Sequence, residues 1–85
     1  MISLAEKRFP VSESIKVLEG TTLFKSDKWW AAVLFVESFG RKQIATYLWS
    51  RKGEKWKRRQ KFVIRKKGEW FQIKEEIEKL LPQLP

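Results

Sequence analysis

The fold is decided by residues 29–51, which read WWAAVLFVESFGRKQIATYLWSR. Residues 29–37 are rich in β-branched and aromatic side chains, so they predict a strand. Phe39 and Gly40 predict the turn that follows, and residues 43–51 predict the next strand. This hairpin is the centre from which the rest of the fold is worked out.

The remaining chain predicts two more strands and a helix. Residues 15–24 predict an irregular strand and residues 56–66 a long one, because the latter ends in the apolar run FVI. Residues 69–81 predict a helix that stops at Pro82. Its apolar residues recur at helical spacing: Trp70, Ile73, Ile77 and Leu80.

The expected fold class is therefore α+β. A four-stranded antiparallel β-meander (residues 15–67) is followed by one C-terminal α-helix packed on one face of the sheet. The 85 residues allow a single domain, and residues 1–14 form an N-terminal arm of uncertain structure.

The charge is concentrated in one segment. The chain carries a net charge of +9, and residues 51–67 hold ten basic residues against the single acid Glu54. The rest of the chain is electrically balanced. A solvated surface usually mixes both signs, whereas an unmixed basic segment attracts polyanions such as nucleic acids.

The residue inventory argues against catalysis. The chain has no histidine and no cysteine, so the usual general base, thiolate nucleophiles and the commonest metal ligands are missing. We expect no enzyme activity, no metal and no cofactor. A signal peptide is also missing, which predicts a cytoplasmic protein. The lack of asparagine, with abundant Lys and Glu, is typical of hyperthermophiles.

Alternation along the strands sorts the candidate binding residues. Phe62 and Ile64 are expected in the core beneath the helix, which leaves the opposite face free. On that face the pattern predicts aromatic rings between cations, with Trp56 at the rim. The candidate nucleic-acid-binding residues are Trp30, Tyr47, Trp49, Arg51, Trp56, Lys57, Arg59, Lys61 and Arg65.

Such a surface suits single-stranded DNA or RNA, since aromatic rings stack on bases and cations contact phosphates without reading sequence. The helix carries Glu75, Glu76 and Glu78, so it is a poor reader of a duplex groove. Two alternatives stay open: a module that docks an acidic protein, and a chromatin protein that coats duplex DNA. Trp49 also fits two roles, stacking on a base or closing an oligomer interface.

The predicted helix begins within residues 68–77, which read GEWFQIKEEI. Several strands followed by such a helix resemble the positive-cofactor-four and Whirly single-strand binders. The small size and Lys/Glu-rich composition resemble the archaeal ThermoDBP-related proteins. The resemblance covers about residues 20–81. It implies a curved sheet that binds single strands, oligomers assembled partly through the helix, binding by Tyr47, Trp49, Lys57, Arg59 and Lys61, and packing by Trp70, Ile73 and Ile77.

The apolar surface exceeds what one helix can cover. Phe71, Leu81 and Leu84 widen the apolar stripe of the helix, and the strand at residues 29–37 is apolar on both faces. We therefore expect a homo-oligomer, most simply a dimer. The alternative is a monomer in which the arm folds over the surplus with Ile2, Leu4 and Phe9.

Overall fold

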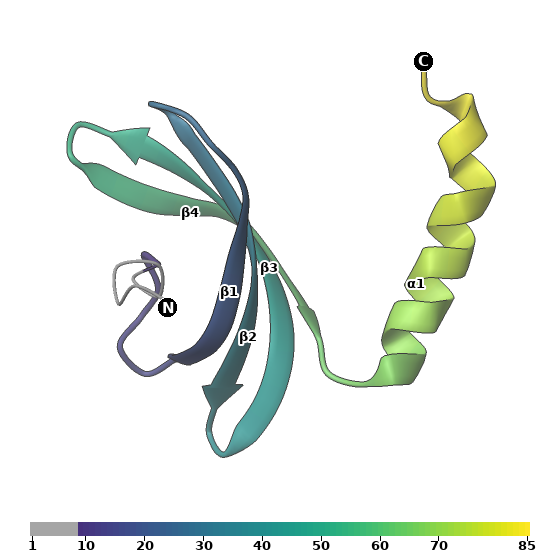
Figure 1. Cartoon of the computed structure of the whole chain (residues 1–85), viewed down its shortest axis with the longest axis horizontal. Helices are drawn as coiled ribbons and strands as arrows, with labels where there is room; N and C mark the ends of the chain where they lie inside the picture. Colours follow the sequence, from purple (N-terminus) through teal and green to yellow (C-terminus); the bar gives the residue numbers. More distant parts are fainter. Residues whose placement is uncertain (1–8) are drawn as a thin grey trace.

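The computed structural model describes residues 9–85, which form four strands and one long helix (Figure 1). Neighbouring strands pair antiparallel in the order β1-β2-β3-β4, and the helix follows the last strand. The predicted α+β meander is confirmed. The elements are β1 (Lys16–Lys25), β2 (Trp29–Ser38), β3 (Arg41–Lys52), β4 (Lys55–Ile64), α1 (Lys67–Leu80) and the short 3-10 turn η2 (Leu81–Gln83).

The turn between β2 and β3 fixes the register of the central hairpin. Phe39 and Gly40 both have positive φ, 53° and 75°, as a two-residue turn of the type I′ kind requires. Trp30 consequently lies opposite Trp49, and Ala32 lies opposite Tyr47. The predicted placement of these side chains on one face is confirmed.

That shared face, called the closed face below, is the hydrophobic core. Its central residues are Trp30, Ala32, Leu34, Val36, Ala45, Tyr47 and Trp49, all buried. The chain segment before β1 lies over them, so that the Phe9 ring is 5.5 Å from Trp30 and 6.1 Å from Trp49 between centroids. Val11, Ile15 and Val17 pack beside Phe9. The expectation that this face is free for a ligand is therefore wrong.

The opposite face, called the open face, was expected to lie beneath the helix. It carries Val33, Phe35, Ile44, Phe62 and Ile64, and Phe62 is 51% exposed. The helix meets this face only near its start and then projects away from the sheet (Figure 1). No residue of α1 is buried. The two faces thus have the reverse of their expected roles.

A β-bulge in β4 separates two cations that alternation alone puts together. Leu48 pairs with Gln60 and Trp49 pairs with Arg58, so Arg59 is the extra residue. Arg59 Nε donates a hydrogen bond to Ser50 Oγ at 2.6 Å, whereas Lys61 lies over the Tyr47 ring. The expectation that Arg59 and Lys61 share one face is wrong, because the bulge switches the alternation between them.

Candidate nucleic-acid interface

Most of the basic segment lies on the turn and the second strand of the hairpin formed by β3 and β4, which we call the basic hairpin. Its two strands are joined by the Gly53-Glu54 turn, and β4 is an edge strand of the sheet. Among residues 9–85 the one ion pair joins Lys79 to Glu76 on α1, so no hairpin cation forms an ion pair with a described carboxylate. Within residues 51–61 its exposed cations are Arg51, Lys52, Lys55, Lys57, Arg58, Arg59 and Lys61.

Three of the predicted aromatic binding residues are core residues instead. Trp49 is fully buried, and Trp30 and Tyr47 are exposed by only 8% and 4%. Tyr47 stacks on Trp49 with ring centroids 5.0 Å apart. Such rings have no free surface for a base. The cause is the covering segment around Phe9, which meets these rings from a distant part of the sequence.

Within the described chain, neither the Tyr47 hydroxyl nor the Trp49 indole N–H has a hydrogen-bond partner. Buried Tyr and Trp usually satisfy these groups, so each one here lowers the stability of the core relative to a fully apolar ring. These two residues are packed for their apolar area rather than for polar contacts.

Trp56 is the predicted aromatic residue that stays partly accessible. Its ring meets Trp30 edge-on at 5.4 Å and is half-buried at the border of the closed face. The Arg51 guanidinium lies 5.7 Å from the Trp56 ring and the Lys25 ammonium 5.8 Å. A base that reaches Trp56 therefore also brings its phosphates close to cations.

Two cations near the rings were not among the predicted site residues. Lys25, at the end of β1, lies 3.9 Å above the Trp30 ring, and it reaches this place because it pairs with Trp30 across the sheet. Arg58 lines a surface hollow with Lys57 and Tyr47. The pairing register would have revealed Lys25, but the bulge that places Arg58 beside Trp49 has no sequence signal.

Phe62 is a further exposed ring that the sequence pattern placed in the core. It lines a shallow hollow on β3 and β4 together with Arg59, Gln60 and Lys61. An exposed ring beside an arginine is a suitable place for a base to stack.

Arg65 is separated from the other predicted cations because it lies at the junction of β4 and α1. The Arg65 backbone N–H donates to Glu69 Oε1 at 2.7 Å, and the Glu69 N–H donates to the Lys66 carbonyl at 3.1 Å. The hydrogen bond from Arg65 lowers the pKa of the Glu69 carboxyl below its ordinary value of 4.5, with help from the nearby positive charges. The Arg65 backbone therefore helps to shape this junction, and binding by its side chain stays a prediction.

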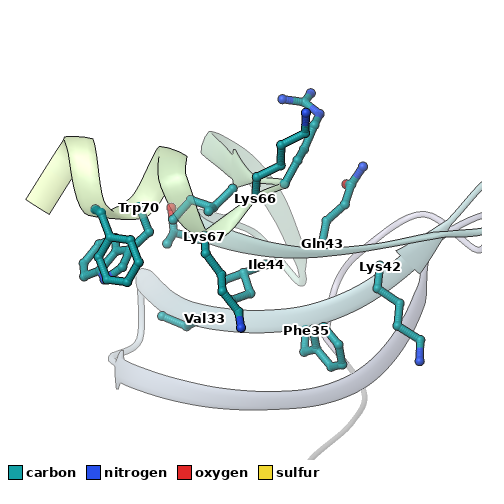
Figure 2. A pocket seen from close by; sticks show the side chains of 12 residues that line it. Val33, Phe35, Lys42, Gln43, Ile44, Lys66, Lys67 and Trp70 are labelled. Carbon is teal, nitrogen blue, oxygen red and sulfur yellow. The ribbon is translucent and has the colours of Figure 1, made fainter.

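A groove of about 500 Å³ opens between the start of α1 and the open face, and we call it the helix groove (Figure 2). Trp70 lies at one end and Lys42 at the other (Figure 2). The floor is apolar and the rim is basic. The lining residues are Val33, Phe35, Lys42, Gln43, Ile44, Thr46, Ile64, Arg65, Lys66, Lys67, Trp70 and Phe71.

Comparison with known proteins found no matching family model, no matching curated protein and no matching solved structure. The resemblance to the positive-cofactor-four and Whirly binders therefore stays a prediction. In residues 9–85 no helix is long and apolar enough to cross a membrane. The same residues hold no cluster of acidic side chains with the spacing of a metal site.

Proposed function

We propose that this protein binds single-stranded nucleic acid through the basic hairpin, largely without regard to sequence. The observation that carries the proposal is that one hairpin presents seven exposed cations within residues 51–61, and none of them forms an ion pair with a carboxylate of the described chain. When such cations bind phosphates, they displace the counterions condensed on the nucleic acid. The release of these counterions supplies affinity for any sequence.

The accessible rings favour single strands over duplexes. Trp56 and Phe62 are the aromatic residues on β4, and each lies close to an arginine. A single strand can turn its bases onto such rings, and each stacked base contributes about 1–3 kcal/mol. A duplex keeps its bases stacked internally and offers only phosphates to the same surface.

The test is fluorescence anisotropy with labelled single-stranded DNA, single-stranded RNA and a blunt duplex, each over a salt series. If about four phosphates are contacted, the logarithm of the single-strand binding constant falls with the logarithm of salt at a slope near −3. Equal or tighter binding to the duplex would support the duplex-coating alternative. Tighter binding to polyglutamate than to any oligonucleotide would support an acidic protein partner.

Matched charge variants locate the surface. Replacing Lys57 and Lys61 together by Gln should reduce the size of the salt slope by about 1.4, since each phosphate contact contributes roughly 0.7. The control replaces Lys16 and Lys74 by Gln, which removes the same charge from exposed positions outside the hairpin. Equal slopes in the two double variants would show that total charge, rather than the hairpin, determines binding.

A further inference from the structure

The helix α1 presents a long apolar stripe that no other part of residues 9–85 covers. Among the described elements, the backbone of α1 approaches only β4 and η2. Trp70 is 44% exposed and Leu80 is 59% exposed. Ile73 and Ile77 share this side of α1 at helical spacing, and the apolar Leu81 and Leu84 follow in and after η2. Exposed apolar area of this extent is typical of an interaction surface.

The helix groove is a second uncovered apolar surface on the same chain. Its floor on β2 and β3 includes Val33, Phe35 and Ile44, and Ile44 is 42% exposed. One chain therefore offers an apolar helix and an apolar groove that do not cover each other along their length (Figure 1).

The junction before α1 holds the helix away from its own sheet. Only Arg65 and Lys66 separate β4 from α1. The hydrogen bond from the Arg65 N–H to the Glu69 carboxylate fixes the direction in which the helix starts. Folding the helix back over the groove would need a different junction, so the groove is left for a helix from another molecule.

The area and size of the chain match a protomer rather than a compact monomer. The chain exposes 7325 Å², whereas a compact monomer of 10.2 kDa exposes about 5300 Å². The radius of gyration is 14.4 Å, against about 12 Å for a compact domain of this length. The projecting helix raises both values (Figure 1). A standard interface buries about 800 Å² per partner, less than this excess.

The charges of the two surfaces are complementary. Glu69, Glu76 and Glu78 border the apolar stripe of α1 together with one cation, Lys74, whereas Lys42, Lys66 and Lys67 line the helix groove. A helix with acidic flanks suits a groove with a basic rim, because like charges would otherwise oppose docking between two cationic chains.

We propose that the occupant of the helix groove is the α1 helix of a second copy of this chain. In a two-fold dimer the exchange is reciprocal, so both stripes and both grooves are buried together. The basic hairpins lie outside this contact. A dimer therefore presents two hairpins to one strand, which raises its affinity for long strands through effective concentration.

Light scattering coupled to gel filtration measures the assembly directly. At low micromolar concentration we expect a mass twice the 10.2 kDa of one chain. Ile77→Glu should halve that mass, and Gln72→Glu, which adds the same charge on the opposite side of the helix, should leave it unchanged. Circular dichroism checks that Ile77→Glu is folded, as expected for a side chain that is already 48% exposed in one chain.

Cross-linking identifies the contact. Because the sequence contains no cysteine, only the introduced cysteines can react. We mix an Ile77→Cys chain with a Phe35→Cys chain and add a short bismaleimide, expecting cross-linked heterodimers. Glu75→Cys, on the polar side of α1, is the control for Ile77→Cys and should give none. An intramolecular link in the Ile77→Cys/Phe35→Cys double variant, with the mass of one chain, would show that the helix folds back and would overturn the proposal. A monomer with no cross-link would overturn it as well.

The dimer and the proposed function fail separately. Ile77→Glu removes no hairpin cation, so its affinity for a strand long enough for one hairpin should stay within about twofold, while its affinity for a strand that spans two hairpins should fall about tenfold or more. Loss of short-strand binding in all variants would contradict the proposed function, and an unchanged mass in Ile77→Glu would contradict the dimer.

Discussion

The two faces of the sheet have similar apolar content, but one is buried and the other is exposed. The closed face holds Trp30, Tyr47 and Trp49 beneath Phe9, and the open face leaves Phe62 half exposed and Ile44 accessible. The difference comes from a segment that precedes the sheet in sequence, not from the strands themselves. Aromatic residues on a strand therefore predict a binding face only when no other part of the chain can cover them.

The largest expected effect is on the closed face. Trp49→Ala should lower the free energy of unfolding by about 3–5 kcal/mol, because it leaves a cavity among Phe9, Trp30 and Tyr47. Phe62→Ala, on the open face, should cost about 1 kcal/mol or less, since half of that ring already meets water. Urea denaturation measures the loss of stability in both variants. Equal losses would contradict the distinction between the two faces.

A smaller effect tests the cover itself. A Cβ at Gly20 would lie 2.6 Å from Phe9 Cε2 and 2.7 Å from Leu34 Cδ2. Gly20→Ala should therefore displace Phe9 and destabilise the protein by about 1–3 kcal/mol. Gly68→Ala is the control, because nothing lies within 4 Å of its added Cβ. Tryptophan fluorescence should shift to the red in Gly20→Ala alone, and an unshifted spectrum would mean that Phe9 does not seal the closed face.

Tyr47→Phe sharpens the distinction between packing and polar binding. The Tyr47 hydroxyl is buried and lacks a partner in the described chain, so its removal should leave stability unchanged or raise it by up to about 1 kcal/mol. Affinity for single strands should not change. A clear loss of either quantity would reveal a polar partner for the hydroxyl and would contradict its assignment as a purely apolar core group.

The junction that keeps the helix off the open face should show a pH dependence. The pKa of Glu69 is lowered by its hydrogen bond to the Arg65 N–H, so this stabilisation is present above the ordinary value of 4.5 and is lost as pH falls through the lower folded value. Wild type should be more stable than Glu69→Gln near neutral pH, and the difference in stability between the two proteins should become smaller in acid. Thermal unfolding over a pH series measures it. A difference in stability that does not change with pH would mean that the carboxylate charge does not stabilise the junction.

The sequence predicted the strands, the helix and the central register because each depends on local features. The Phe39-Gly40 turn decides which residues of β2 and β3 face each other. It did not predict which face is covered, because Phe9 reaches the core through contacts remote in sequence. The extra residue Arg59 is likewise invisible in the alternation, and the bulge puts Arg59 on the opposite side of the sheet from Lys61, which stays beside Tyr47. The concentration of positive charge on this hairpin was predictable, because the charge of a segment can be counted without knowing how its strands pair.

Nuclear magnetic resonance during a titration with single-stranded DNA tests the central claim most directly, since it reports which surface the strand contacts. We predict that backbone amides of residues 51–61 and the indole N–H of Trp56 shift in proportion to bound strand, whereas the indole signals of Trp30 and Trp49 and the amides of α1 stay in place. Shifts that concentrate at Trp49 and Tyr47, with the hairpin unmoved, would contradict binding through the basic hairpin.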